Sequence, residues 1–307
     1  MSKVLNFGSL NIDYVYSVER FVRAGETISS LNMEIFCGGK GLNQSIALAR
    51  AGASVYHAGA VGEDGEVLLN TLISEQIDVS QVCVQSGRSG HAIIQTDVEG
   101  QNCIMLFGGA NRKISNEHVE ATLTGFSEGD YLILQNEINN NEKIMSLAKN
   151  KGMKIVLNPS PMDDAAFNLP LELVDMFVLN EVEAEILCGV SCPEKMMQRL
   201  KLLFPNVSIL LTLGEKGALY LDSEMEVPMR HCAYKVSAVD TTAAGDTFMG
   251  FFISCIAKGE SIEKSLEVAS KASAITVSNK GASVSIPMME DVMAARFMPS
   301  ESDFSFY

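Results

Sequence analysis

The sequence predicts an α/β fold, with a central, mostly parallel β-sheet covered by helices on both faces and a small antiparallel β-sheet set apart as a lid. Three observations support this prediction. Short, continuous apolar segments alternate with amphipathic helical patterns along most of the chain, as in βαβ units whose strands are buried on both faces. Two other segments show strand-like alternation with no helix between them. No internal repeat or linker divides the chain.

The strands of the central sheet are predicted where apolar residues form short continuous runs. These segments are residues 4–7, 56–61, 130–134, 154–157, 176–179 and 208–213. Helices are predicted where apolar residues recur at helical spacing. These segments are residues 41–51, 65–75, 142–151, 181–188 and 193–204. The two sets interleave, as parallel strands with helical crossovers require.

The lid is predicted from residues 14–36 and 91–107, where polar and apolar residues alternate. A turn at residues 97–101 would join two of its strands as a hairpin. We therefore expect one domain over residues 1–307, with the lid sheet taken from about 13–37 and 90–108. The segment after Met298 is expected to be loosely held.

Composition excludes several classes of partner. The chain has 307 residues, of which 47% are hydrophobic and 20% charged, with a net charge of −15. Such an acidic protein is a poor match for nucleic acid or for an anionic membrane, which need a basic surface. A nucleotide substrate stays possible, because a local pocket with Mg²⁺ can hold phosphates.

The N-terminal sequence and the cysteines favour a cytoplasmic location. The first residues lack the cationic start and long apolar run of a signal peptide, and no run of 18 or more apolar residues suggests a transmembrane helix. The seven cysteines are scattered. Cys188 and Cys192 form the nearest pair, without the neighbouring ligands that a zinc site needs. Reduced thiols are therefore expected.

The segment Asp240-Thr-Thr-Ala-Ala-Gly-Asp246 is the most informative motif. Phe248 and the apolar residues after it follow helical spacing, so the small residues 243–245 fall on the first turn of a helix. Free backbone amides and the positive end of the helix dipole attract anions there. Amides beside a carboxylate suit phosphoryl transfer, since the carboxylate can accept a proton from an alcohol. An ordinary capped helix start is the alternative.

A second helix start carries Gly38-Gly-Lys-Gly-Leu-Asn-Gln44. It is neither a Walker A loop nor a dinucleotide-binding fingerprint, because residues and spacing differ from both. Glycines allow the backbone to approach a ligand closely, and Asn43 can donate to and accept from hydroxyl groups. A plain glycine-rich turn would look the same.

Further polar residues follow the predicted strands. Asn11 and Asp13 come after the first strand and would point the same way in an extended chain; they could bind vicinal hydroxyls or form an Asx-turn. Asn180 and Glu183 follow the strand 176–179, where α/β sheets present ligand groups, although a capping box explains the same pattern. Glu137 and the turn 212–217 also follow strands.

Taken together, these motifs resemble those of the ribokinase (PfkB) family of carbohydrate and nucleoside kinases. The resemblance runs from Gly8 to about Pro287 and includes two family signatures, at residues 38–44 and 240–246. Residues 157–161, 180–183 and 212–217 follow in the family's order. It implies a Rossmann-like, three-layer, ribokinase-like fold and an ATP-dependent sugar kinase acting on the 5-hydroxyl of D-ribose.

The resemblance also implies roles for individual residues. Asp246 would be the catalytic base, and the amides of Ala243, Ala244 and Gly245 would hold the transferred phosphoryl group. The sugar would be bound by Asn11, Asp13, Gly39, Lys40, Asn43, Glu137 and Asp246. ATP would contact Asn180, Thr212, Gly214, Gly217 and Gly245. Its adenine would lie between residues 236–239 and the helix near 268–272.

Metal ions and a second subunit are implied in the same way. Glu183 would organise Mg²⁺, largely through water. A K⁺ ion would be coordinated, mostly through backbone oxygens, by Asp240, Thr242, Thr276, Asn279, Gly281 and Ser285. The bare, apolar lid would be covered by the lid of a second subunit in a homodimer. Ala243 stands where many members have glycine, and Leu42, Ser45 and the lid residues also differ, so the sugar itself stays open.

Three alternatives remain. The acceptor could be another small sugar, such as a ketohexose or deoxyribose, or a nucleoside. The chain could be a catalytically silent sugar-binding protein, although Asp246, the glycine-rich turn and Glu183 are all present. A nicotinamide-dependent dehydrogenase would need a Rossmann fingerprint, which the sequence lacks.

Overall fold

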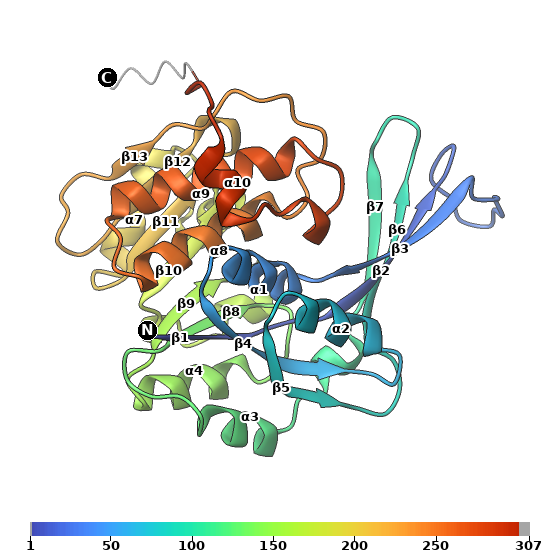
Figure 1. Cartoon of the computed structure of the whole chain (residues 1–307), viewed down its shortest axis with the longest axis horizontal. Coiled ribbons are helices and arrows are strands. Elements are labelled where there is room, and N and C mark those ends of the chain that lie inside the picture. The colour runs from blue at the N-terminus through green and yellow to red at the C-terminus, as the bar shows by residue number, and fades with distance from the viewer. Residues whose placement is uncertain (1, 301–307) are drawn as a thin grey trace.

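The computed structural model describes residues 2–300 of the 307-residue chain. Nine strands form its main sheet in the order β13-β12-β11-β10-β9-β8-β1-β4-β5 (Figure 1). These strands are β1 (Lys3–Phe7), β4 (Ser54–Val61), β5 (Asp78–Val84), β8 (Tyr131–Gln135), β9 (Lys154–Asn158), β10 (Met176–Asn180), β11 (Ser208–Thr212), β12 (Ala218–Leu221) and β13 (Met229–His231). All neighbouring pairs from β5 to β11 are parallel, whereas β12 is antiparallel to both β11 and β13.

Ten α-helices accompany the sheets in the described residues. They are α1 (Lys40–Arg50), α2 (Glu66–Ser74), α3 (Asn116–Leu123), α4 (Asn141–Asn150), α5 (Asp164–Phe167), α6 (Glu181–Cys188), α7 (Pro193–Leu203), α8 (Ala244–Ala257), α9 (Ile262–Val277) and α10 (Met289–Ala294). Short 3₁₀ turns are η1 (Gly109–Arg112), η2 (Leu171–Leu173), η3 (Gly214–Lys216) and η4 (Ser283–Ser285).

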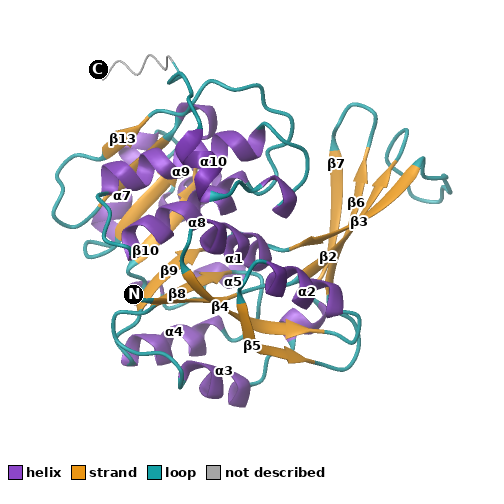
Figure 2. Ribbon diagram, in the orientation of Figure 1, coloured by secondary structure: helices purple, strands orange, loops and turns teal. Residues whose placement is uncertain are grey.

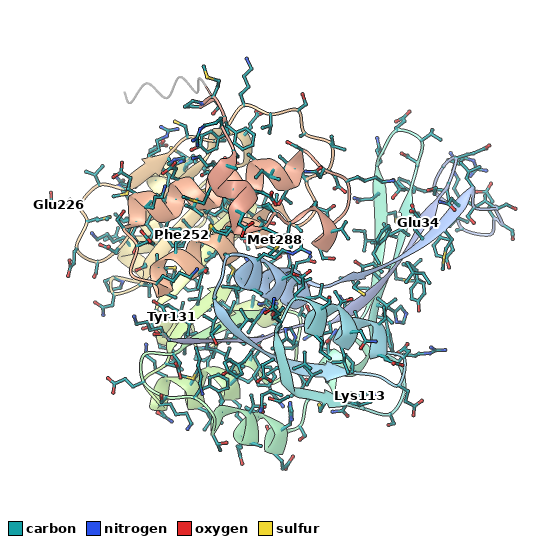
Figure 3. The ribbon with its side chains drawn as sticks, in the orientation of Figure 1. Glu34, Lys113, Tyr131, Glu226, Phe252 and Met288 are labelled. Carbon is teal, nitrogen blue, oxygen red and sulfur yellow. The ribbon has the colours of Figure 1, made fainter. Side chains whose placement is uncertain are left out.

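Two hydrophobic cores lie on opposite faces of the main sheet. Successive side chains of a strand point to opposite faces, so Val4 of β1 joins one core and Leu5 joins the other. The first core contains apolar residues of α1, α2, α8 and α9, and the second contains those of α3, α4, α6 and α7. The result is the three-layer arrangement visible in Figure 2. Phe252 of α8, labelled in Figure 3, lies in the first core, and its ring centroid is 5.8 Å from that of Tyr220 of β12.

The second sheet stands off the main body as a long projection (Figure 1). Its strands are β2 (Asn11–Ser17), β3 (Asn32–Gly38), β6 (Gly90–Thr96) and β7 (Asn102–Phe107), in the order β3-β2-β6-β7. Its outer pairs are antiparallel, whereas β2 and β6 run parallel. Parallel strands need a long crossover, and here the chain passes through α1, β4, α2 and β5 between them.

These observations confirm the predicted fold class, a mostly parallel sheet with helices on both faces and a small second sheet. The predicted helices begin and end within about one residue of α1, α2, α4, α6 and α7. A hairpin turn joins β6 to β7 as expected, with Asp97 Oδ1 accepting from the backbone amides of Glu99 and Gln101 at 3.0 and 2.9 Å.

The end of the chain differs in part from the expectation of a loose tail. The amide of Lys235 donates to the carbonyl of Met298 at 3.0 Å, and the amide of Ser300 donates to Ala233 at 2.8 Å. Residues up to Ser300 are therefore tied to the main domain, and the rest of the tail lies outside the described residues. Among residues 2–300, every helix is too short or too polar to cross a membrane.

Candidate active site

The predicted site residues converge on the carboxyl edge of the main sheet, where open α/β sheets place their ligands. Asn180 and Thr212 are the last residues of β10 and β11, and Glu137 follows β8. Asp246 comes to the same edge on the first turn of α8. The parallel registers align these strand ends, as in the pairing of Asn180 with Thr212.

Asp246 is buried, with 8% of its surface exposed, and both oxygens of its carboxylate accept hydrogen bonds. Nε2 of Gln44 donates to Oδ1 at 2.8 Å, and Nδ2 of Asn43 donates to Oδ2 at 3.2 Å. Both donors lie on the first turns of α1. Packing of α1 against α8 therefore orients this carboxylate.

The backbone before Asp246 forms an amide-rich turn. Ala243, the N-cap of α8, has the left-handed conformation with φ of 61°, which is unfavourable for any residue with a Cβ. It turns the chain so that Ala244, Gly245 and Asp246 begin the helix, where backbone amides lack helical acceptors, although the amide of Ala244 donates to the carbonyl of Thr241 at 3.3 Å. The site thus combines a carboxylate with an anion-binding helix terminus.

A cavity of about 210 Å³ lies in front of this turn. It is lined by Lys40, Asn158, Val178, Leu179, Asn180, Glu183, Thr212, Thr241, Ala243, Ala244, Gly245, Asp246 and Met249. Burial acts to lower the pKa of the Lys40 ammonium, but neighbouring carboxylates outweigh burial and raise the pKa; they belong to Asp246, Glu137 and Glu183. The ammonium, the amides and the dipole of α8 together favour a polyanion in this cavity.

A second, larger cavity of about 450 Å³ adjoins the first and shares Thr212, Thr241, Ala244 and Gly245 with it. Its walls are mostly apolar and include Gly214, Gly217, Val236, Ala238, Phe248, Ala274 and Val277. The predicted segment 236–239 therefore contributes to this cavity. Residues Ser270, Ser273, Ala274 and Val277 of α9 line it, whereas Val268 and Ala272 are buried in the core.

On the other side of Asp246, polar residues gather where the lid meets the main sheet. Asn11 and Asp13 lie on β2, and Gly39 is the N-cap of α1 with φ of 93°. No hydrogen bond joins the Asp13 carboxylate to another residue in the range 2–300. Burial raises the pKa of Asp13 to about 7, and the charge of Glu137 adds to this effect. A half-buried carboxylate with a raised pKa and no protein partner is characteristic of a ligand site.

Gly38 makes the position of Asp13 possible. A Cβ at residue 38 would lie 2.0 Å from Oδ2 of Asp13, so any larger residue would displace this carboxylate. The glycine-rich motif thus leaves space for the Asp13 side chain on the neighbouring strand β2, and it also leads into α1.

Glu137 is held by neighbours that leave one oxygen available. Its Oε2 accepts from the hydroxyl of Ser9 and, at 3.1 Å, from the amide of Lys40. Burial raises the pKa of Glu137, although the hydrogen bond from Ser9 and the charge of Lys40 oppose this. Within the described chain, Oε1 of Glu137 accepts no hydrogen bond, so it can face a ligand hydroxyl.

Asn111 is a site residue that sequence reasoning missed. Its Nδ2 donates to Oδ1 of Asn11 at 2.8 Å, and its Oδ1 accepts from the amide of Leu10 at 3.1 Å. Asn11 consequently turns its own amide donor group toward the site. Asn111 lies on η1, far from Asn11 in sequence, and no local motif identified it.

Asn180 and Glu183 form a capping box at the start of α6. The amide of Glu183 donates to Oδ1 of Asn180 at 2.8 Å, and the amide of Asn180 donates to Oε2 of Glu183 at 3.0 Å. Nδ2 of Asn158 also donates to Oε2 of Glu183 at 3.3 Å. The capping box that the sequence pattern also indicated is therefore present. The same two residues line the 210 Å³ cavity.

The predicted cation loops meet behind the α8 turn. Oδ1 of Asp240 accepts from the amide of Thr242 at 2.9 Å, and Oδ2 accepts from the amide of Gly281 at 3.0 Å. Burial acts to raise the pKa of Asp240, but these hydrogen bonds outweigh it and lower the pKa.

The remaining three predicted cation ligands bond elsewhere through their side chains. Thr276 bonds to Thr247, Asn279 to the carbonyl of Ile275, and Ser285 to the carbonyl of Ala282. Each of these side chains donates in its bond, so the hydroxyl oxygens of Thr276 and Ser285 and Oδ1 of Asn279 keep lone pairs for an ion.

The chain belongs to the pfkB family of carbohydrate kinases, whose family model matches residues 1–289. It is 35% identical to a ribokinase of Haemophilus influenzae over 303 residues, covering 95% of this chain and 98% of that one. The crystal structure of a ribokinase from Cryptococcus neoformans in complex with ADP has a TM-score of 0.85 at 31% identity, covering 96% of this chain and 99% of that one. That of an Arabidopsis thaliana ribokinase complexed with ribose and ATP has a TM-score of 0.84 at 29% identity, covering 96% and 98%.

Proposed function

We propose that this chain transfers the γ-phosphoryl group of ATP to the 5-hydroxyl of D-ribose, with Asp246 as the general base. The observation that carries the proposal is the position of Asp246. Its carboxylate lies on the first turn of α8, between the cavity lined by Lys40 and Glu183 and the polar cluster of the lid. A base at that point can reach a sugar hydroxyl on one side and a phosphate on the other.

The transfer step follows from this placement. Asp246 accepts the proton of the 5-hydroxyl while the hydroxyl oxygen attacks the γ-phosphorus. The bond from the γ-phosphorus to the bridging oxygen breaks, and ADP leaves with that oxygen. The amides at residues 243–245 would stabilise the charge on the moving phosphoryl group, because donors fixed in advance need not reorganise during the reaction.

Binding of the sugar would use groups that lack protein partners. Oδ1 of Asn43 is buried and without a hydrogen bond in the described residues, and the half-buried Asp13 carboxylate also accepts no hydrogen bond there. Each would cost free energy when left unpaired, about 1–3 kcal/mol for a neutral group, and a hydroxyl that donates to it removes this cost. With Asn11 donating and Glu137 accepting, the cluster offers polar partners to several hydroxyls, as a pentose provides.

ATP would occupy the two adjoining cavities. The apolar walls of the 450 Å³ cavity suit a purine ring, and the 210 Å³ cavity suits phosphates. Among residues 2–300, no group of three acidic, histidine or cysteine residues could hold a metal ion by itself, so Mg²⁺ would be held mainly by the phosphates. Mg²⁺ commonly keeps several waters and one or two carboxylates, and Glu183 would bind those waters. When bound, the ion neutralises phosphate charge.

Three further features are part of the proposal. K⁺ would bind between the loops joined by Asp240 and Gly281. Exposed apolar residues of β7, Ile104, Met105, Leu106 and Phe107, support a homodimer through the lid, because each is at least half exposed. The seven free cysteines support a cytoplasmic location.

The function is tested by ADP release with Mg²⁺-ATP across D-ribose, 2-deoxyribose, fructose and adenosine. We expect the highest kcat/KM for ribose, because 2-deoxyribose leaves a buried polar group of the site unpaired. A higher kcat/KM for any competitor would overturn the ribose assignment and leave the kinase class intact. No ADP release with any acceptor would overturn the kinase itself.

A further inference from the structure

A chain of buried side-chain amides leads away from Asp246 into the main domain. Oε1 of Gln44 accepts from Nε2 of Gln135 at 2.6 Å, and the same Nε2 donates to Oδ1 of Asn6 at 3.0 Å. Nδ2 of Asn6 donates to the carbonyl of Gly41 at 2.8 Å. Gln44 completes the chain by donating to Asp246 at 2.8 Å. Asn6, Gln44 and Gln135 are each at most 1% exposed, so water does not compete for these bonds.

The direction of the bonds in this chain is set from both ends, because the carbonyl of Gly41 and the carboxylate of Asp246 can only accept. The carbonyl of Gly41 can only accept, so Asn6 must turn its Nδ2 toward it and its Oδ1 away. That oxygen requires a donor, which makes Gln135 present Nε2. The same Nε2 then requires the oxygen of Gln44. Gln44 is left with its Nε2 facing Asp246, the orientation that a carboxylate needs.

A reversed Gln135 would lose both bonds, because its oxygen would face the oxygens of Asn6 and Gln44. Its Oε1 already has no hydrogen-bond partner within residues 2–300. Space for that oxygen depends on Gly8, where a Cβ would lie 2.4 Å from it. Oε1 of Gln135 is therefore left without a donor, whereas Nε2 of Gln135 donates to both Asn6 and Gln44.

A branch connects the same amide to the phosphate side of the site. Nε2 of Gln44 lies 3.5 Å from Oδ1 of Asn158, and Nδ2 of Asn158 donates to Oε2 of Glu183 at 3.3 Å. The orientation of Gln44 thus affects the carboxylate beside the sugar and the one beside the phosphates.

We propose that Gln135 is a positioning residue for phosphoryl transfer: through Gln44 it holds the Asp246 carboxylate in the orientation that receives the hydroxyl proton. This inference rests on the proposed kinase activity. Without Gln135, Oε1 of Gln44 loses its donor, and the carboxamide of Gln44 is held from one side only. It can then move away from Oδ1 of Asp246, and the carboxylate loses the donor that orients it. Neither Gln135 nor Asn6 has to touch the sugar or ATP, so substrate binding should be spared.

The test replaces Gln135 by methionine, which has a similar shape and no amide. We expect Gln135→Met to lower kcat about tenfold or more, since small misplacements of catalytic groups are costly. The KM values for ribose and ATP should change by less than roughly threefold. Gln44→Met should lower kcat at least as much. The double variant should be no slower than Gln44→Met alone, because Gln135 acts through Gln44.

Ser45→Ala is the matched control. Ser45 is fully buried, accepts from Nδ2 of Asn6 at 2.8 Å and bonds to Nδ1 of His57 at 2.8 Å. It lies beyond Asn6, whose direction the Gly41 carbonyl still sets. We expect this variant to lose thermal stability to a similar extent as Gln135→Met while keeping kcat within about twofold. An equal loss of kcat in both variants would show general damage and overturn the proposal, as would additive effects of the two glutamine substitutions.

A crystal structure of the Gln135→Met variant gives a readout that is independent of activity. We expect the Gln44 carboxamide to have rotated or moved out of hydrogen-bond distance of Oδ1 of Asp246. An unchanged Gln44–Asp246 bond in this variant overturns the positioning role even if the proposed substrate is wrong. Failure of the wild-type enzyme to phosphorylate any acceptor rejects the proposed function instead, so the two failures are distinguishable.

Discussion

Nδ2 of Asn43 donates to Oδ2 of Asp246 at 3.2 Å, while Oδ1 of the same Asn43 side chain is buried without a partner in the described residues. One carboxamide therefore contacts the proposed base and offers an acceptor beside it. A sugar hydroxyl that donates to Oδ1 of Asn43 lies next to Asp246. Since Asn43 is on α1 and Asp246 is on α8, the packing of these two helices sets the distance between substrate and base.

Asp246→Asn should reduce kcat by about 10²–10⁴-fold, the usual loss when a general base is removed. The new amide group would also face a donor, because Asn43 and Gln44 both donate to this side chain. We expect ribose binding to change little, and calorimetric titration with ribose beside initial-rate kinetics would show this. Asp164→Asn, an exposed change on α5, should keep full activity. A variant at residue 246 with near-normal turnover would contradict the assignment of the base.

The stability of the unliganded protein should depend on the ionisation of Asp13. Its pKa is about 7 in the folded state, above the ordinary 3.8, so the native state binds this proton more tightly than the unfolded state. The resulting stability is fully present below pH 3.8 and is lost as the pH rises through about 7. Between these values the free energy of unfolding should fall by up to ~1.4 kcal/mol per pH unit from this group.

Urea unfolding of the wild type and of Asp13→Asn at several pH values from about 5 to 8 measures this effect. The asparagine variant cannot ionise, so its stability should fall less steeply with pH than that of the wild type. Equal slopes for the two proteins would show that Asp13 ionises normally in the fold. Titrating groups distant from residue 13 are common to both proteins and cancel in the difference, whereas Glu137, whose charge acts on Asp13, belongs to the measured effect.

Ala243→Gly should stabilise the protein or leave it unchanged. Ala243 has φ of 61°, a conformation that costs an alanine about 1 kcal/mol and a glycine almost nothing. Ala244→Gly is the control, because Ala244 has helical geometry and glycine there should cost up to ~1 kcal/mol. Thermal unfolding of both variants compares these effects. A clear loss of stability in Ala243→Gly would mean that the Ala243 methyl group contributes more than the strain costs.

Replacing K⁺ by Na⁺ or Li⁺ at constant ionic strength should lower kcat or raise the KM for ribose. An ion between the Asp240 and Gly281 loops would support the turn that presents the amides of residues 243–245, and such preorganised donors contribute roughly 3–4 kcal/mol to transfer reactions. Asp240→Ala should remove most of the difference between the salts.

Asp222→Ala is the matched control for the cation site, because Asp222 also bonds two loop amides, those of Glu224 and Met225 at 2.9 and 3.0 Å. It should keep the K⁺ dependence. Equal rates in all three salts would reject the cation site and leave the kinase assignment intact.

The lid should make the protein a dimer at micromolar concentration. Ile104 and Leu106 of β7 are 52% and 60% exposed and lie on one face of the lid, two positions apart. The double change Ile104→Glu and Leu106→Glu should yield monomers by light scattering. Leu202→Glu, at an exposed position on α7 outside the lid, should leave the dimer intact. A monomeric wild type would refute the proposed dimer.

Local sequence patterns were sufficient for most of the fold. The apolar runs of β1, β8, β9, β10 and β11 and the helical spacing of α1, α4 and α7 agree with the structure, because burial on both faces of a parallel sheet demands continuous apolar residues. β5, β12 and β13 were missed. They are edge or near-edge strands with mixed or very short sequences, and pairing with neighbours rather than local pattern makes them strands.

The pairing of the lid strands shows a similar limit. Alternation in residues 14–36 and 91–107 indicated strands with one polar and one apolar face. It could not show that β2 pairs with β6 in parallel, since period-two alternation is the same in both directions. The order β3-β2-β6-β7 follows from where the intervening βαβ units return the chain.

The sequence by itself determined the fold class, the helix starts that carry Asn43 and Asp246 and the strand end at Asn180, because each of these is a local pattern of size, polarity and spacing. Only the tertiary structure decided the orientation of the groups at the site. Asn6 and Gln135 lie on strands β1 and β8, whereas Gln44 lies on helix α1. Asn111 and Asn11 are a hundred positions apart. A hydrogen bond depends on direction as well as distance, and direction arises only when distant segments pack around the same buried side chain.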